Sequence, residues 1–346
     1  MHFKIGNKII GDNHPTFIIA ELSANHNHNF DIAVKTIKAA KEAGADAIKL
    51  QTYTADTITI NNNNKYFKIG DGIWKEKTLY DLYKTAYTPW EWQPKLKKIA
   101  DELGILLFSS PFDKTAVDFL HKMKVPCFKI ASFEALDIPL IEYIASKGKP
   151  VIISTGMTNL ADISEAINAC HKMGNKNIAI LKCTSIYPAP FEELNLKTIP
   201  HMKETFKTPV GFSDHTLGIE AAIAAVSVGA KIIEKHFILD KKLGGPDASF
   251  SIDPKELKRM VTSIRNTEKA LGEINYNLSP KSKKSAKFAR SLFIVEDIKK
   301  GDPFTEKNIR SIRPGFGIPP KYINIILGKK AKKNFKKGTP VTWDII

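Results

Sequence analysis

Two histidines stand at the ends of consecutive apolar runs and could hold a metal ion. His215 closes the run PVGFSDH, and His236 nearly closes the next run, KIIEKHF. If these runs form adjacent strands of a parallel sheet, about 4.8 Å apart, the two imidazoles converge. A lone histidine in such a place more often hydrogen-bonds a neighbour. A pair with open coordination positions instead favours a borderline divalent ion such as Mn²⁺, Co²⁺ or Zn²⁺.

Two lysines inside apolar runs predict a site for a small anion. Lys49 lies in AIKLQTYT and Lys129 in CFKIAS, where a lysine needs a charged partner. Gly156 can let a backbone N–H approach a ligand. Hydroxyls are supplied by Ser109, Ser110, Ser132, Ser154, Thr155, Thr184 and Ser185. Such a set suits an anion that carries phosphate and carboxylate. A lysine that forms a Schiff base, as in barrel aldolases, is the alternative.

Eight short apolar runs position these residues and predict a (β/α)8 barrel. They begin at Phe17, Ala47, Ile105, Cys127, Pro150, Asn177, Pro209 and Lys231. Each is followed by a stretch with helical periodicity, which is typical of buried parallel strands alternating with helices. Barrel active sites lie at the carboxyl ends of the strands. The polar residues should therefore face one mouth. Glu21, which ends the first strand beside the eighth, could reach the metal or act as a base.

A second domain is expected after the barrel. The segment from Asp253 to Gly272 has an N-cap residue, helical spacing and a terminal glycine, and it indicates the eighth barrel helix. We predict a barrel over residues 1–275, a linker over 276–285 and a small β-rich domain over 286–346. The insertion over residues 55–88 is either a lid or a packing excursion.

Charge and composition narrow the function. Residues 276–346 contain 17 Lys and Arg against five Asp and Glu, so they carry +12 of the net charge of +16. No RNA-binding or zinc-finger motif accompanies this charge, so we expect a solvated or anion-attracting surface and no nucleic-acid partner. No apolar run reaches about 18 residues and no signal-peptide pattern is present, which predicts a cytoplasmic enzyme without a membrane partner. Cys127, Cys170 and Cys183 are expected to be free thiols.

Ten motifs carry a family resemblance along nearly the whole chain. They are AELSANH, KLQTYT, SSPF, KIAS, STGM, KCTSIYPAP, GFSDHT, EKHF, GGPDASFS and IRPGFG. Through them the chain resembles the sialic acid synthase family. The resemblance implies a TIM barrel and a C-terminal antifreeze-like (SAF) domain, which covers the partner's barrel in a domain-swapped homodimer. It also implies a transferase that condenses phosphoenolpyruvate with an open-chain amino sugar, releases phosphate and forms a nine-carbon α-keto acid.

The resemblance assigns roles position by position. It implies a divalent metal, commonly Mn²⁺, with Mg²⁺ or Co²⁺ as alternatives, held by His215 and His236. Glu21 would assist proton transfer, and Arg313 would reach into the partner's site to bind an N-acyl group of the sugar. The positions that match phosphoenolpyruvate-binding residues are Lys49, Ser110, Lys129, Ser132, Ser154 and Ser213. Those that match residues lining the metal and sugar region are Glu21, Gln51, Tyr187 and Asp247.

Two departures from the neuraminate synthase pattern point to a different sugar. Ser185 stands where those enzymes carry Asn, and Ala248 follows Asp247 where they carry His. A methyl group in place of an imidazole suits a sugar that lacks a hydroxyl, and the resemblance implies 2,4-diacetamido-2,4,6-trideoxy-L-altrose. Synthesis of N-acetylneuraminate or legionaminate by the same chemistry is an alternative, and a Schiff-base aldolase is another.

Overall fold

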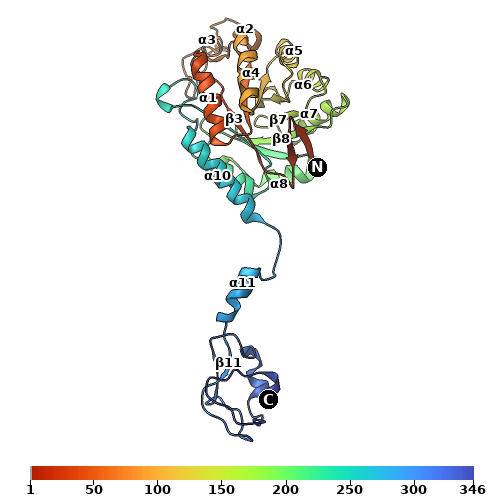
Figure 1. Ribbon diagram of the computed structural model, residues 1–346. Helices are drawn as coiled ribbons and strands as arrows, with labels where there is room; N and C mark the ends of the chain where they lie inside the picture. Colours follow the sequence, from red (N-terminus) through yellow and green to blue (C-terminus); the bar gives the residue numbers. More distant parts are fainter. Residues whose placement is uncertain (1) are drawn as a thin grey trace. The chain divides into compact units, whose positions relative to one another are not determined.

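The computed structural model describes residues 2–346, and its contacts divide the chain into two compact units, residues 1–272 and 273–346 (Figure 1). In the first unit the predicted barrel is confirmed: eight strands close in the order β10-β3-β4-β5-β6-β7-β8-β9, all parallel. The strands are β3 (Phe17–Glu21), β4 (Ala47–Thr52), β5 (Leu106–Pro111), β6 (Phe128–Ile130), β7 (Val151–Ser154), β8 (Ile178–Cys183), β9 (Val210–Asp214) and β10 (Ile232–His236).

A helix follows each barrel strand. These helices are α1 (Phe30–Ala43), α4 (Gln93–Leu103), α5 (Lys114–Lys122), α6 (Ile138–Ala145), α7 (Leu160–Lys172), α8 (Thr198–Phe206), α9 (Glu220–Ser227) and α10 (Pro254–Leu271). Helix α10 starts where the sequence predicts, because the Asp253 side chain accepts hydrogen bonds from the backbone N–H groups of Lys255 and Glu256. Apolar faces of the helices pack on the strands and form the core of this unit.

An N-terminal hairpin precedes the barrel and was not predicted. Its strands are β1 (His2–Ile5) and β2 (Lys8–Gly11), which pair antiparallel. Phe3 and Ile5 are buried and alternate with exposed residues, so one face of the hairpin packs against the rest of the protein. The sequence features that could have predicted the hairpin are this alternation and the residues Gly6 and Asn7, which form the tight turn.

The 55–88 insertion packs at the carboxyl end of the barrel. It contains α2 (Ala55–Ile58) and α3 (Leu79–Ala86). Between them, Trp74 donates from Nε1 to the carbonyl oxygen of Pro246, 3.1 Å away, in the loop after β10. The ring of Trp74 also lies 5.6 Å from that of Tyr187, in the loop after β8. The insertion thus joins the loops that surround the mouth.

The second unit has its own apolar core. Strands β11 (Ser291–Ile294) and β12 (Ile309–Ile312) pair antiparallel, and a short helix, α12 (Ile323–Ile326), follows. Leu292, Phe304 and Val341 are fully buried in this core. The segment predicted as a linker contains a short helix, α11 (Pro280–Ser285), which Ser279 caps. Across residues 2–346, no helix has the length and apolar character needed to cross a membrane.

Candidate active site

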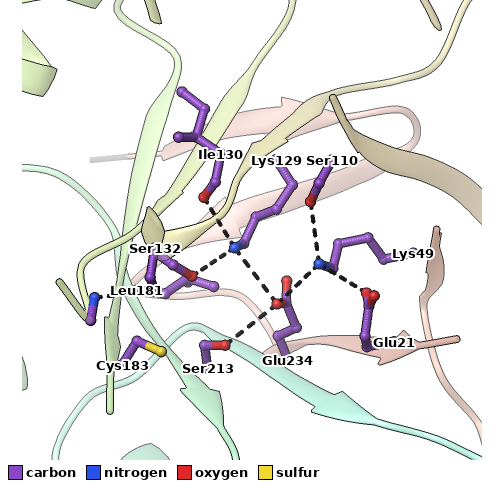
Figure 2. A network of polar contacts seen from close by, with 12 residues as sticks. Glu21, Lys49, Ser110, Lys129, Ile130, Ser132, Leu181, Cys183, Ser213 and Glu234 are labelled. Carbon is purple, nitrogen blue, oxygen red and sulfur yellow. Dashed lines mark hydrogen bonds and ion pairs between the residues drawn. The ribbon is translucent and has the colours of Figure 1, made fainter. Parts of the chain in front are cut away.

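Two lysines and a glutamate form the charged centre of the barrel lumen (Figure 2). Lys49 on β4 and Lys129 on β6 both approach Glu234 on β10, with Nζ–Oε1 distances of 3.3 and 3.6 Å. All three side chains are buried. The lysines therefore have the charged partner that burial demands. They also hold two ammonium groups close together, which is an arrangement suited to a multiply charged anion.

Glu21 joins this centre from β3. Its Oε2 lies 2.9 Å from Lys49 Nζ, and its Oε1 accepts a hydrogen bond of 3.1 Å from Gln51 Nε2. Burial, opposed by Lys49 and assisted by the charge of Glu234, raises the pKa of Glu21 to about 7. A carboxyl group with such a pKa can give or take a proton at neutral pH.

The pKa values of the two lysines shift in opposite directions, because their ion pairs differ. Burial favours the neutral form of Lys49, but the neighbouring Glu21 and Glu234 overcome it and raise its pKa. Burial lowers the pKa of Lys129, and Glu234 opposes that shift without cancelling it. Lys129 Nζ nevertheless donates to Ser154 Oγ at 2.6 Å and to the carbonyl oxygen of Ile130 at 3.2 Å.

A cradle of small polar groups lies beside Lys129. Gly156 donates its backbone N–H to Ser132 Oγ, 3.2 Å away. A Cβ at position 156 would collide with Ser185 Oγ and would lie 2.9 Å from Ser132 Oγ and 3.1 Å from Cys183 Sγ. Glycine is therefore required for the two serines to converge on this backbone. The cradle can donate hydrogen bonds to oxygens of an anion held by the lysines.

The two predicted metal-binding histidines come together at the strand ends. The rings of His215 and His236 are 5.5 Å apart between centroids, and both side chains are buried. His215 Nδ1 lies 3.0 Å from the carbonyl oxygen of Thr184, a contact that leaves Nε2 free as a ligand. Burial, together with His215, holds the pKa of His236 well below its usual range, so its ring is neutral.

The donor set around these histidines fits a metal with two protein ligands. Within residues 2–346, His236 Nδ1 is buried without a hydrogen-bond partner, and Asp247 Oδ2 lies 3.7 Å from it. No group of three or more His, Cys, Asp or Glu side chains suited to a metal occurs in this described part of the chain. Two imidazoles, one of them neutral and with an unused nitrogen, match a borderline divalent ion whose other ligands come from water or substrate.

Aromatic side chains border the histidines on the side of the loops. The ring of Tyr187 lies 4.4 Å from that of His215 and 5.2 Å from that of Phe250. Asp247 is buried in the loop after β10 and accepts a hydrogen bond from the backbone N–H of Ala24. Ala248, next to it, is also buried. This side of the site is made by loops, whereas the lysine side is made by strands.

The structure places the predicted hydroxyl groups, and that of Ser213, in different surroundings. Ser110 lies 3.3 Å from Lys49 Nζ, and Ser213 Oγ lies 3.4 Å from Glu234 Oε1. Ser109 was wrongly included, because its hydroxyl points to the other face of β5 and bonds Thr52 at 2.6 Å. The Thr155 and Thr184 hydroxyls donate to the backbone carbonyl oxygens of Leu181 and Glu193.

Three residues of the site were not assigned from the sequence. They are Glu234, Cys183 and Glu134. Glu234 stands two positions before His236, so strand alternation places both on the same face. Cys183 Sγ lies 3.8 Å from His215 Nδ1. Burial raises the pKa of Glu134 to about 7, and the charges of Lys129 and Lys49 oppose that shift.

Arg313 is the one predicted site residue outside the barrel unit. It follows β12 in the second unit, where its side chain is exposed. The other predicted site residues, Glu21, Lys49, Gln51, Ser110, Lys129, Ser132, Ser154, Ser185, Tyr187, Ser213, His215, His236 and Asp247, belong to strands or loops of the barrel. The predicted role of Arg313 remains a prediction.

Comparisons with known proteins agree with this architecture. A family model described as the NeuB family matches residues 36–276, and one described as the SAF domain matches residues 289–346. A protein named pseudaminic acid synthase from Campylobacter jejuni serotype O:2 is 47% identical over 93% of this chain and 94% of its own. One of the same name from Helicobacter pylori is 44% identical over 96% of this chain and 98% of its own.

A solved structure matches the whole chain. It is that of the spore coat polysaccharide biosynthesis protein SpsE from Bacillus subtilis, with a TM-score of 0.69 and 36% identity. The match covers 100% of this chain and 99% of that one.

Proposed function

This chain belongs to the NeuB family and is an enzyme, and we propose that it synthesises pseudaminic acid. The substrates would be phosphoenolpyruvate, 2,4-diacetamido-2,4,6-trideoxy-L-altrose and water, and the products pseudaminic acid and phosphate. The buried triad of Lys49, Lys129 and Glu234 carries the proposal, because it provides two ammonium groups for one small anion. The names of the two bacterial relatives support the choice of product.

The chain's own residues divide the work of the reaction. Lys49 and Lys129 would bind the phosphate and carboxylate of phosphoenolpyruvate, and the cradle at Gly156 would donate further hydrogen bonds. C3 of phosphoenolpyruvate then attacks the aldehyde carbon of the sugar, water adds at C2, and phosphate leaves with cleavage of the C2–O bond. The fixed ammonium groups stabilise the anionic groups throughout without reorganising. Glu21 would transfer a proton near neutral pH.

We propose a divalent metal, Mn²⁺ foremost and Mg²⁺ or Co²⁺ as alternatives, at His215 and His236. The unpartnered nitrogen of His236 and the tautomer set on His215 by Thr184 support this assignment. When bound, the metal would act as a Lewis acid on the sugar aldehyde. Asp247 and Tyr187 would shape the space for the sugar around it.

The sugar preference rests on the loop side of the site. Ala248 offers no hydrogen bond beside Asp247, so the hydroxyl of a C6 CH₂OH group would lose its partner on binding. An unsatisfied buried hydroxyl costs about 1–3 kcal/mol, which is roughly tenfold to a hundredfold in kcat/KM. A C6 methyl group meets no such cost. N-acetylmannosamine should therefore be the poorer substrate.

We further propose a homodimer in which the second unit of each chain serves the partner's barrel. Large apolar side chains of the loops after β6, β7, β8 and β9 are 43–61% exposed: Phe133, Leu136, Met157, Ile186, Phe191 and Leu217. Exposed apolar side chains on the loops of neighbouring strands are typical of an interaction surface and support this proposal. On the second unit, Phe316 is 65% exposed and stands three residues after Arg313.

The free thiols of Cys127, Cys170 and Cys183 suit a cytoplasmic location, which we also propose.

Phosphate release across a panel of sugars tests the function. We expect release only when phosphoenolpyruvate, an amino sugar and a divalent metal are all present, with the altrose derivative turned over fastest. Equal or faster turnover of N-acetylmannosamine or of the legionaminate precursor would replace the sugar assignment and leave the condensation standing. Inactivation by borohydride with substrate, without phosphate release and without an effect of EDTA, would instead identify a Schiff-base aldolase.

A further inference from the structure

A fully buried ion pair lies behind the two histidines, on the other face of their strands. Lys235 on β10 and Asp214 on β9 are register partners, and Lys235 Nζ lies 2.8 Å from Asp214 Oδ2. Both side chains are 0% exposed. Side chains alternate along a strand, so this pair faces away from the lumen that holds Ser213 and Glu234. It touches none of the groups assigned above to the substrates.

Both residues of the pair form hydrogen bonds with one residue, Thr216. Asp214 Oδ1 accepts hydrogen bonds from the backbone N–H of Thr216 at 2.9 Å and from its hydroxyl at 2.8 Å. Lys235 Nζ donates to the carbonyl oxygen of Thr216 at 2.8 Å. Thr216 directly follows His215, and Lys235 directly precedes His236. The pair thus ties the turn that carries one imidazole to the strand that carries the other.

Stability alone does not account for such a pair. Taking two charges out of water is costly, and apolar replacements of similar volume are often neutral or stabilising. What an apolar pair cannot do is hold the three polar groups of Thr216 in place. We propose that Lys235 and Asp214 are positioning residues, which fix His215 and His236 at the spacing that a divalent metal requires. This inference rests on the proposed metal site.

Binding of Mn²⁺ to the full-length chain, measured by titration calorimetry, tests the inference. Lys235→Met together with Asp214→Leu removes both charges and every tie to Thr216, and we expect a folded protein with metal affinity weakened about tenfold or more, as when partners of metal ligands are removed. Lys235→Met with Asp214→Asn retains an amide oxygen for the N–H and hydroxyl of Thr216. Its loss of affinity should be smaller, and it serves the same comparison if the leucine variant does not fold.

Asn175→Ala is the matched control. Asn175 is a buried polar residue at the amino end of β8, where its Nδ2 donates to the carbonyl oxygen of Lys149 at 2.7 Å. Its removal should lower the melting temperature, because it leaves a partly buried carbonyl oxygen without this donor. Its affinity for Mn²⁺ should stay within twofold of wild type. This separates lost stability from lost positioning.

Hydrogen exchange of the metal-free protein gives a readout independent of the metal. The amide of Thr216 should exchange faster in the Met/Leu variant, while the core of β8 keeps its protection. Folded double variants with wild-type Mn²⁺ affinity and unchanged exchange at Thr216 would overturn the positioning role. A wild-type chain that binds no Mn²⁺ would overturn the metal assignment and, with it, this positioning role.

Discussion

Glu21 Oε2 lies 2.9 Å from Lys49 Nζ, on register partners of two neighbouring barrel strands. The contact stabilises the charged form of Glu21, yet burial outweighs it and the pKa of Glu21 is raised to about 7. Near neutral pH the carboxyl group is thus poised between its two forms beside an ammonium group that an anionic substrate would also use. Substrate binding and the proton on Glu21 should therefore be coupled.

Phosphoenolpyruvate should bind more weakly as the pH rises through 7. An added anion disfavours the ionised form of Glu21, so binding takes up a proton, and the dissociation constant should rise by up to about tenfold per pH unit above the pKa. Calorimetry between pH 7 and 8.5 avoids the titration of the ligand itself, because this range lies above the phosphate pKa of about 6. Glu21→Gln should flatten the profile. A wild-type affinity that is constant over this range would contradict the coupling.

Glu134→Gln should stabilise the protein at high pH. Burial raises the folded-state pKa of Glu134 from 4.5 to about 7, so its stabilising contribution is full below about 4.5 and is lost as the pH rises through 7. Glutamine removes that loss, which is on the order of 2 kcal/mol at pH 8 relative to pH 5. Thermal melts at both pH values measure it. Glu204→Gln, at an exposed position on α8, should show no such difference.

Gly156→Ala should impair the anion cradle without unfolding the barrel. The new methyl group would collide with Ser185 Oγ and crowd Ser132 Oγ at 2.9 Å. Loss of one or two hydrogen bonds to a charged ligand should weaken phosphoenolpyruvate binding about tenfold or more. The KM for phosphoenolpyruvate in the phosphate-release assay is the readout. The control is Gly70→Ala, where an added Cβ meets no described atom within 4 Å.

His215→Ala or His236→Ala should abolish turnover together with metal binding. One imidazole leaves too few protein ligands to hold a divalent ion at this site. Metal content after purification, measured by elemental analysis, should fall far below one ion per chain. Either variant with near-stoichiometric metal and a normal rate would refute the two-histidine site.

Mixed dimers test whether Arg313 acts in the partner's barrel. Neither Arg313→Ala nor Lys129→Ala homodimers should be active. A heterodimer of the two should regain roughly half of the wild-type activity, because one of its barrels then has both an intact lumen and an intact arginine from the partner. Differently tagged chains purified by two affinity steps would supply the heterodimer. Absence of activity in verified heterodimers would exclude the exchanged arrangement.

The barrel was predictable because buried parallel strands are continuous apolar runs, and all eight appear in the sequence. Which residue of an adjacent pair faces the lumen was harder to predict. Ser109 and Ser110 are chemically identical neighbours, and only one of them reaches a lysine. Glu234 and Lys235 pose the same problem, because both are charged and buried within one run. Only strand alternation, counted from His236 as the register partner of Glu21, assigns the inward position to Glu234.

Strands supply the lysines and glutamates of the lumen, whereas loops supply Tyr187, Asp247 and the insertion with Trp74. The closed ring of strands fixes where the lumen side chains stand, whereas loops tolerate substitution, insertion and deletion. Evolution could therefore exchange the aldehyde acceptor while the enolpyruvyl donor stayed the same. In such a scaffold a change of sugar would need changes only in the rim loops, and the residues proposed to bind the donor would stay with the strands.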